Sequence, residues 1–386
     1  MSSPIRPTHD LLVVGAGPSG CVIAERAAEE LGLSVLVIDR RQHIAGNCFD
    51  RVDGNGLLRH EYGPHYFRTD DAPLVAYLSR FTGWIPGNYR VKCLVRGELY
   101  PFPINLTTLE KFFHRELTET SARALLQRLA EKIPHPANSE EFVLSRIGRE
   151  LYEAFYLGYT EKQWGRPPRE LDASVCGRIP VRFDRDDRYA DAPIQQMPAA
   201  GYTAMFRAML DHPRIEIRLG VDYRELRQAV VPRLATAYCG PLDEYFENRL
   251  GPLPWRSLRF EHRALDVEYA QPCVQINYPG DEPFTRTVEI KHVTAQRAPT
   301  TVVTYEYPAA DGEPFYPVPA PESAARFALY RELAEREERE RQVYFTGRLA
   351  SYRYINTDQA MLQALSTFDR MRGVLTAAPV RVQASR

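Results

Sequence analysis

Apolar runs alternate with amphipathic stretches over the first forty residues of the chain. Apolar runs at 11–14 and 35–38 flank a stretch at 18–32 in which apolar residues recur with a helical period. Strands that are buried on both faces need apolar residues at every position, whereas a helix that covers a sheet needs them on one face only. The pattern therefore predicts a β-α-β unit with parallel strands over residues 10–40.

Similar elements return in the middle and at the end of the chain, and two different patterns lie between them. Residues 201–212 predict a helix, 215–220 and 235–240 predict strands, and 343–347 and 357–373 predict a strand and a closing helix. A strand-turn-strand segment at 90–104 leads into helical stretches from 107 to 159, and Asn138 is the predicted cap of the last of these helices. Residues 255–308 are β-branched and aromatic with turn signals between them, which predicts an antiparallel sheet, and a charged helix follows at 323–342.

The composition is that of an ordinary globular protein whose net charge is too small to create a strong electrostatic field. Hydrophobic residues make up 44% of the 386 residues and charged residues 26%, with a net charge of -1. This balance argues against a nucleic-acid or membrane-surface partner. Neither an apolar run long enough to span a bilayer nor a secretory signal pattern is visible, and the six scattered cysteines lack metal-site spacing. We therefore expect a cytoplasmic protein with reduced thiols and no metal.

A glycine motif sits at the junction of the first predicted strand and helix. Gly15, Gly17 and Gly20 fit G-x-G-x-x-G, and Asp39 ends the second predicted strand. In a Rossmann-like unit these glycines allow a tight turn, close approach of the backbone to a pyrophosphate and close packing of helix on strand, while the acid accepts from a ribose hydroxyl. The strand, helix, second strand and acid lie at the spacing that such a unit requires, so we predict a dinucleotide site.

FAD is favoured over NAD by two features. The site lies at the extreme N-terminus, and a second glycine-containing loop, residues 40–47, follows the acid and includes Arg40, Gly46 and Asn47. We predict an α/β fold with a discontinuous Rossmann-like FAD-binding domain (1–88, 201–250 and 340–386). A helical substrate-binding insertion (104–190) and an antiparallel-sheet insertion (89–103, 191–200 and 251–339) would interrupt it.

The segment HEYGPHYFRTDDA, residues 60–72, crowds two histidines, aromatic residues, a Gly-Pro break and an arginine together. It could be a surface loop of mixed composition or one wall of an active site. Further segments accompany it in order along the chain: VVGAGPSG, HIAGN, YGPHYF, FPIN, LYEAFYLGYTEKQWG, GRIPVRF, GYTAMF, GPLDEYF, RSLRFE, INY, FTRTVEIKH, EYP, FYPV and GRLASYRY.

Together these segments resemble the flavin-dependent UDP-galactopyranose mutase family over nearly the whole chain. The resemblance implies an isomerase that interconverts pyranose and furanose forms of a nucleotide sugar through an adduct of the sugar with N5 of reduced flavin, without net redox change. It implies an FAD cofactor that is active when NAD(P)H or another reductant has reduced it. It also implies a UDP-sugar as the favoured substrate and assembly as a homodimer. The nucleobase stays open between UDP and dTDP.

The resemblance also assigns roles to residues. Arg178 and Arg286 would hold the substrate pyrophosphate, and two guanidinium forks suit a diphosphate leaving group. His65 would lie beside the flavin. Phe155 and Tyr159, four residues apart on a predicted helix, would project from one face toward the base. The implied substrate set is Phe155, Tyr159, Trp164, Arg178, Tyr189, Arg286, Tyr316 and Tyr354, and the implied cofactor set adds His65, Arg348, Tyr354 and Asn356 to the glycines, Asp39, Arg40, Gly46 and Asn47.

Two positions depart from the family pattern. Arg68 stands where a second histidine is usual, and Asn356 stands where an aspartate is usual. With His65, Arg178 and Arg286 they complete the predicted catalytic set. If both line the pocket, its potential becomes more positive, so the substrate would carry an anionic or deoxy sugar in place of galactose; drift at supporting positions is the alternative. A flavin oxidoreductase acting on a nucleotide sugar and a catalytically silent binding protein also remain as alternative functions.

Overall fold

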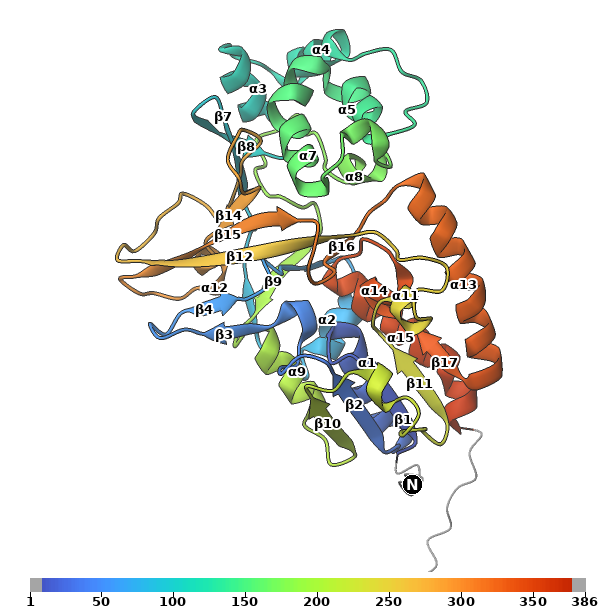
Figure 1. Ribbon diagram of the computed structural model, residues 1–386. Coiled ribbons are helices and arrows are strands. Elements are labelled where there is room, and N and C mark those ends of the chain that lie inside the picture. Colours follow the sequence, from blue (N-terminus) through green and yellow to red (C-terminus); the bar gives the residue numbers. More distant parts are fainter. Residues whose placement is uncertain (1–8, 377–386) are drawn as a thin grey trace, which may run out of the picture.

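The computed structural model describes residues 9–376, and a five-stranded sheet forms the lower layer of the molecule (Figure 1). All four pairs of neighbouring strands are parallel. Alternate residues of the first strand are buried on opposite faces, Leu11 and Val13 on one and Leu12 and Val14 on the other, which explains its uninterrupted apolar run. The strand order is β10 (Ile215–Leu219), β2 (Val35–Asp39), β1 (Leu11–Val14), β11 (Ala235–Tyr238) and β17 (Val343–Phe345).

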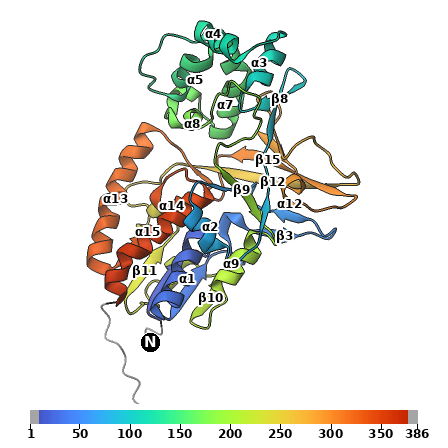
Figure 2. The same ribbon diagram turned by 180° about the vertical axis from the view of Figure 1, so that it is seen from behind.

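Helices cover both faces of this sheet, and Figure 2 shows the face that carries α1, α9 and α15. The predicted β-α-β unit is confirmed by β1, α1 and β2, and the closing helix by α15. One face carries α1 (Pro18–Leu31), α9 (Tyr202–Leu210), α15 (Thr357–Thr376), α14 (Gly347–Ser351) and α2 (Ala72–Leu78). The other face carries α10 (Tyr223–Leu226), α11 (Leu242–Tyr245) and α13 (Pro321–Arg341). Within residues 9–376 no helix is both long and apolar enough to cross a membrane.

Helix α13 lies where the sequence did not place it. The predicted antiparallel-sheet insertion includes residues 321–339 of this helix, but the helix packs against β17 and α11. Tyr330 and Ala334 are its buried contacts, against Leu242 and Phe246. The few apolar side chains of this charged helix pack against the apolar side chains of α11 and β17, at the edge of the parallel sheet. Residues 1–8 and 377–386, which the predicted domain bounds include, lie outside the described residues.

A seven-stranded sheet crosses the middle of the molecule. Its neighbours pair antiparallel except β13 with β7, so the predicted antiparallel sheet forms with one parallel pair in it. The exception arises because the predicted 90–104 hairpin, which forms with a turn at Arg96 and Gly97, joins the sheet edge from a distant part of the chain. The strand order is β16 (Tyr316–Pro317), β12 (Trp255–Leu265), β15 (Thr301–Ala309), β14 (Arg286–Val288), β13 (Gln275–Asn277), β7 (Val91–Val95) and β8 (Glu98–Phe102).

Two small sheets and short turns connect these layers. In the first small sheet β9 (Ile194–Pro198) lies between β5 (Phe67–Thr69) and β6 (Trp84–Pro86), and in the second β3 (Asp50–Val52) pairs with β4 (Leu58–His60). Strand β5 thereby carries the end of the 60–72 segment into the region between the layers. The remaining short elements are η1 (Gly46–Cys48), η3 (Pro168–Glu170) and α12 (Lys291–Thr294).

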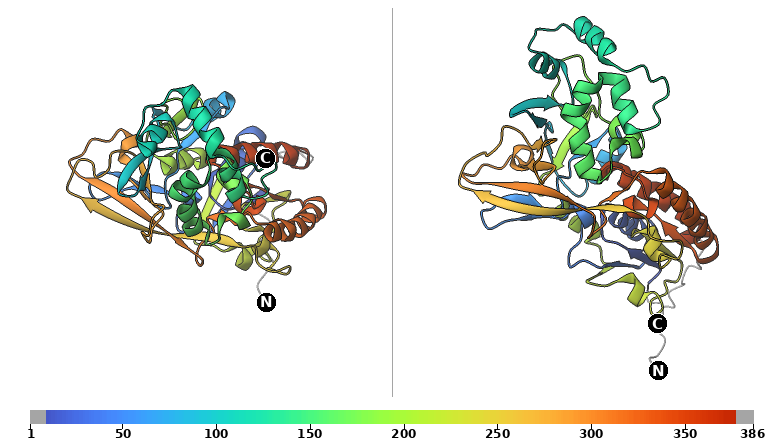
Figure 3. Two further views of the ribbon diagram at one scale, coloured as in Figure 1. Left: turned by 90° about the horizontal axis from the view of Figure 1, so that it is seen from above. Right: turned by 45° about the horizontal axis from the view of Figure 1, so that its top comes forward.

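A helical layer stands above the seven-stranded sheet (Figure 3). The amide of Glu141 donates to Asn138 Oδ1 at 2.9 Å, which confirms the predicted cap. The single helix expected from there to 159 is wrong, because the chain turns at Gly148, where a Cβ atom would lie 2.2 Å from the Leu129 carbonyl oxygen. The helices are α3 (Leu106–Phe113), α4 (Glu119–Leu129), α5 (Ser139–Ile147), α6 (Arg149–Tyr152), the π-helical η2 (Glu153–Leu157), α7 (Gly158–Trp164) and α8 (Ser174–Gly177).

Candidate active site

The glycine motif forms a turn that exposes backbone at the start of α1. Gly15 has φ 107°, and a Cβ atom on Gly20 would lie 1.8 Å from the Gly15 carbonyl oxygen. A Cβ atom on Gly46 would lie 3.0 Å from Gly17 Cα, so the two glycine-containing loops meet in direct backbone contact. The first amides of α1 begin at this point and have no partner within the helix. The arrangement is suited to phosphate oxygens.

Asp39 holds both loops. It ends β2, and its Oδ2 accepts from the amide of Ala16 at 2.8 Å while its Oδ1 accepts from the amide of Arg41 at 2.9 Å. One carboxylate therefore fixes the glycine turn and the loop after the acid relative to each other. Its side chain also lines the adjoining cavity, where it can accept from a ligand hydroxyl.

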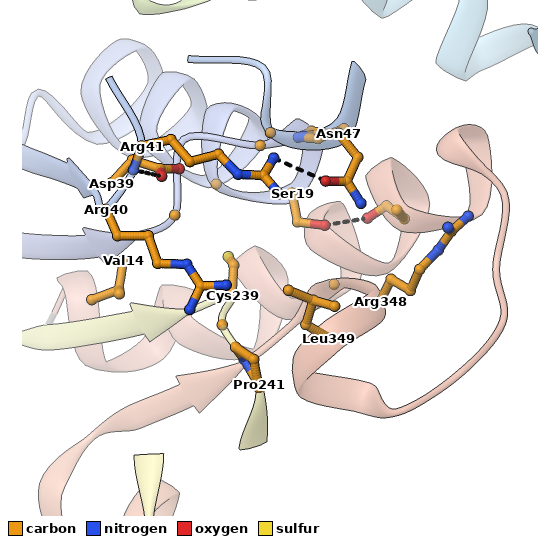
Figure 4. Close-up of a pocket in the computed structure, with 18 of the residues that line it drawn as sticks. Val14, Ser19, Asp39, Arg40, Arg41, Asn47, Cys239, Pro241, Arg348 and Leu349 are labelled. Carbon is orange, nitrogen blue, oxygen red and sulfur yellow. Dashed lines mark hydrogen bonds between the residues drawn. The ribbon is translucent and has the colours of Figure 1, made fainter. Parts of the chain in front are cut away.

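A first cavity, of about 1140 Å³ with its open mouth included, runs along these loops. Figure 4 shows it as elongated, with Asp39 and Arg40 at one end, Ser19 at its middle and Arg348 at the far end. Ten of the eleven predicted cofactor residues line it: Gly15, Gly17, Gly20, Asp39, Arg40, Gly46, Asn47, His65, Arg348 and Asn356. Tyr354 lines the neighbouring cavity instead. Within residues 9–376 no group of three or more His, Cys, Asp or Glu residues is placed to hold a metal.

A second cavity opens between the parallel-sheet layer, the seven-stranded sheet and the helical layer. Of the predicted substrate residues, Arg178, Tyr189, Arg286, Tyr316 and Tyr354 line it. The two cavities meet, since five residues line both: Asn47, His65, Arg348, Asn356 and Thr357. A group at the Arg348 end of the first cavity therefore forms part of the wall of the second.

A buried carboxylate, which sequence reasoning missed, holds Arg286. Arg286 Nε donates to Glu306 Oε2 at 2.6 Å and Nη2 donates to the Tyr316 hydroxyl at 3.0 Å. Glu306 is 0% exposed, and burial raises its pKa while Arg286 opposes that rise. A Cβ atom on Gly63 would lie 2.9 Å from Glu306 Oε1, so this carboxylate also packs against the loop before His65. Glu306 belongs to the EYP segment, but no local pattern marked it.

Arg178 and Tyr354 also line the second cavity. Arg178 Nη2 donates to the Tyr354 hydroxyl at 2.7 Å, and the guanidinium carbon lies 3.8 Å from the centre of the tyrosine ring. Arg348 also stacks toward this ring, at 5.4 Å, and its Nε donates to the Ile355 carbonyl at 3.0 Å. Burial disfavours ionisation of Tyr354, yet Arg178, Arg348 and Arg286 together lower its pKa. The cavity is lined by four arginines, Arg68, Arg178, Arg286 and Arg348, an arrangement that suits an anionic ligand.

His65 is held neutral where the cavities meet. Its Nδ1 lies 3.0 Å from the Gly63 carbonyl oxygen, which can only accept, so Nδ1 carries the proton and Nε2 is a hydrogen-bond acceptor. Burial, with smaller effects of the neighbouring His60 and Arg348, lowers the pKa of His65 to about 3. The His65 amide donates to His60 Nδ1 at 3.1 Å, and His60 Nε2 faces Asp50 Oδ2 at 3.8 Å. Two buried side chains behind His65 thus support its backbone.

Because the folded-state pKa of His65 lies below the ordinary value near 6.5, the unfolded chain binds more protons between these values. The contribution of neutral His65 to the free energy of unfolding is therefore fully present above about pH 6.5 and is lost as the pH falls toward 3. We expect His65→Gln to remove this contribution, which would reduce the acid slope of the free energy of unfolding by up to about 1.4 kcal/mol per pH unit. Urea denaturation of both proteins from pH 4 to 7.5 measures the difference. Equal slopes would contradict a fold-imposed neutral His65.

The structure does not bring three aromatic residues of the predicted substrate set to the wall of the second cavity. Phe155 is 2% exposed and packs against Tyr100 and Phe112 in the core. Phe155 lies in η2, which is π-helical, so its wider turn replaces the regular helix that the sequence predicts between Phe155 and Tyr159. Trp164 packs behind the cavity, with its ring centroid 5.9 Å from that of Tyr354. Tyr159 is half-buried near Arg286, and its contact with a base stays a prediction.

The 60–72 segment is a wall of this site. Tyr66 and Arg68 line the second cavity, whereas Phe67 is fully buried in the core, because neighbouring residues of β5 face opposite sides. Arg68 Nη2 lies 3.5 Å from Asn356 Oδ1, and its guanidinium carbon lies 5.7 Å from the centre of the Tyr189 ring. The two residues that depart from the family pattern are thus neighbours, and both face the second cavity.

Comparison with known proteins agrees with this architecture. A family model described as UDP-galactopyranose mutase matches residues 154–354, which is more than half of the chain, and one described as an NAD(P)-binding Rossmann-like domain matches residues 13–81. A probable UDP-galactopyranose mutase of Klebsiella pneumoniae is 40% identical over 93% of this chain and 94% of its own length, and a dTDP-fucopyranose mutase of Escherichia coli is 34% identical over 92% and 97%. A crystal structure of reduced UDP-galactopyranose mutase shares the fold, with a TM-score of 0.75 at 17% identity over 95% of this chain and 96% of the other. The chain therefore belongs to the UDP-galactopyranose mutase family, whose members are isomerases.

Proposed function

We propose that the protein exchanges the pyranose and furanose rings of a nucleotide sugar, using reduced FAD and with no net redox change. The junction of the two cavities carries this proposal. A dinucleotide along the glycine loops would place its far end among Asn47, His65 and Arg348, which also line the arginine-rich second cavity. The reactive part of the cofactor and the anionic part of the substrate would therefore meet at this junction.

The residues present fit FAD. The glycine turn leaves no room for a side chain at Gly20, and Asp39 faces the same cavity. Gly15, Gly17 and Gly46 would lie along the pyrophosphate, Asp39 at the ribose, and His65, Arg348 and Asn356 at the isoalloxazine. When bound and reduced, the flavin supplies a nucleophilic nitrogen to the anomeric carbon of the sugar.

The chain's own side chains have three tasks in this reaction. Arg178 and Arg286 come from different layers and face one cavity, so together they can hold a diphosphate and stabilise the charge that develops when it leaves. His65 offers a neutral acceptor at the junction. The ring wall formed by the buried Trp164 and Tyr316 and the half-buried Tyr354 would exclude water behind the reacting groups.

The test is to load the protein with FAD and supply UDP- and dTDP-sugars, with the flavin either oxidised or reduced by dithionite or NAD(P)H. We expect a furanose product by NMR only with reduced flavin, and no consumption of NAD(P)H beyond the initial reduction. Stoichiometric consumption with substrate would instead identify a flavin oxidoreductase. Binding without turnover in either state would identify a silent homologue.

Arg68 and Asn356 are the proposed determinants of the sugar. Relative to the usual histidine and aspartate they make the cavity more positive by up to about two charges, and effects of a few kcal/mol are typical of such changes in a low-dielectric cleft. Among the relatives, one is named for a galactose nucleotide and another for a fucose nucleotide, a deoxy sugar, so the family scaffold accepts different sugars.

We expect the double variant Arg68→His with Asn356→Asp to raise kcat/KM for UDP-galactose, relative to that for a uronic or deoxy sugar nucleotide, by about tenfold or more. The measurement is kcat/KM across a panel of UDP-galactose, UDP-galacturonic acid and dTDP-fucose, with each single variant beside the double one. An unchanged ranking of the panel would show that the two residues do not select the sugar.

A further inference from the structure

Lys162 joins helix α7 to the loop between β13 and β14. Its ammonium donates to three backbone carbonyls of that loop, Gly280 at 2.7 Å, Glu282 at 2.9 Å and Phe284 at 3.2 Å. An ammonium has three donors that diverge tetrahedrally, and here all three find partners in one turn of the chain. The loop is thereby anchored to a single side chain more than a hundred residues away in sequence.

The identity of this residue is informative in so arginine-rich a chain. Only five of the 49 basic residues are lysines, at 92, 111, 132, 162 and 291. A guanidinium presents its donors as a flat fork, which matches a carboxylate or phosphate but does not converge on three carbonyls of one turn. The three diverging donors of a lysine ammonium therefore suit these carbonyls.

Two further contacts press α7 against the same loop. A Cβ atom on Gly158 would lie 2.1 Å from the Pro279 carbonyl oxygen, so the first turn of α7 touches the loop backbone directly. The Thr285 hydroxyl donates to Gln163 Oε1 at 3.2 Å. The loop then leads straight into β14, which begins at Arg286. Helix α7 carries Tyr159 and ends at Trp164.

We propose that Lys162 is a positioning residue that sets the spacing between α7, on the nucleobase side of the substrate, and Arg286, on its diphosphate side. The proposal rests on the proposed function, because it takes Arg286 to bind the diphosphate and α7 to face the base. A ligand that spans both regions binds more tightly when their separation is fixed, whereas the affinity of a ligand that occupies one region does not depend on that separation.

Lys291 provides a matched control. Its ammonium is also held by three carbonyls, those of Glu268 at 2.6 Å, Ala298 at 2.6 Å and Thr300 at 3.0 Å, and its side chain is 3% exposed. It lines neither cavity, and its cage is formed by loops that do not contain a predicted site residue. Substitution of Lys291 therefore measures how much an ammonium held by three carbonyls contributes to stability, apart from any effect on ligand binding.

The experiment compares the FAD-loaded wild type with Lys162→Met, Lys162→Arg and Lys291→Met. For each protein the dissociation constants of UDP and of inorganic pyrophosphate, KM, kcat and Tm are measured. We expect both Lys162 variants to bind UDP at least about tenfold more weakly and to raise KM more than they lower kcat, with pyrophosphate affinity within about twofold of wild type. Lys291→Met should lower Tm and leave the UDP affinity unchanged.

Three results would overturn the proposal: UDP affinity unchanged in Lys162→Met, an equal loss of UDP and pyrophosphate affinity, or full function in Lys162→Arg. The second result would mean that Lys162 supports Arg286 alone. In each of these cases the wild type still binds UDP and turns over nucleotide sugars, so the proposed function stands. A wild type that binds neither UDP nor dTDP would instead overturn the proposed function.

Discussion

Arg286→Met is expected to lower kcat/KM by roughly 10²–10³-fold and to reduce the free energy of unfolding by about 3–5 kcal/mol. The loss of activity follows from the removal of one of two guanidinium groups that face the second cavity. The loss of stability has a separate cause. Glu306 is fully buried, and Arg286 Nε is its ion-pair partner at 2.6 Å, so methionine leaves an unpaired charge in the interior. Steady-state kinetics and urea denaturation measure the two effects independently.

The double variant Arg286→Met with Glu306→Gln separates these causes. An uncharged glutamine removes the unpaired buried charge, so we expect most of the lost stability to return while kcat/KM stays near that of Arg286→Met. Recovery of activity together with stability would show that Arg286 acts only by holding the fold. A double variant as unstable as the single one would show that the ion pair is not what Glu306 contributes.

Local patterns predicted those parts of the fold in which neighbours in sequence determine the structure. The apolar runs of β1 and β2, the glycine turn between β1 and α1, and the Asn138 cap each depend on a few consecutive residues, and each forms as predicted. Glycine and cap signals are reliable here because they reflect a steric or hydrogen-bonding requirement of the backbone itself. The Rossmann-like layer therefore follows from the sequence.

Features that depend on distant contacts were not visible in this way. The chain turns at Gly148, where the Leu129 carbonyl lies close to the backbone, and Phe155 lies in the core on the π-helical η2. Neither feature leaves a signal in the periodicity of the segment. The resemblance to a family supplied Arg178 and Arg286, which no spacing connects, but it did not single out supporting residues such as Glu306 and Lys162. Their roles arise only from what the fold places beside them.

Gly17→Ala is expected to weaken FAD binding by at least about 100-fold while leaving the apoprotein as stable as the wild type. Gly17 has an ordinary φ of -82°, and the nearest atom to a Cβ there is Gly46 Cα at 3.7 Å, so the folded chain accommodates the methyl group. The methyl group would nevertheless project into the space that the pyrophosphate must approach. Titration of apoprotein with FAD, followed by flavin fluorescence, measures the affinity, and thermal unfolding of the apoprotein measures the stability.

Gly20→Ala is the informative comparison, because the added methyl group at this position would clash with the protein's own backbone. Its Cβ atom would lie 1.8 Å from the Gly15 carbonyl oxygen and 3.1 Å from Val13 Cγ1, so helix α1 must move away from β1. We expect this variant to lose apoprotein stability as well as FAD. If Gly17→Ala retains FAD like the wild type, the pyrophosphate does not approach this turn. If Gly17→Ala loses apoprotein stability as Gly20→Ala does, the two glycines are needed only for the packing of α1 on β1. They would then shape the first cavity without contributing to its affinity for FAD.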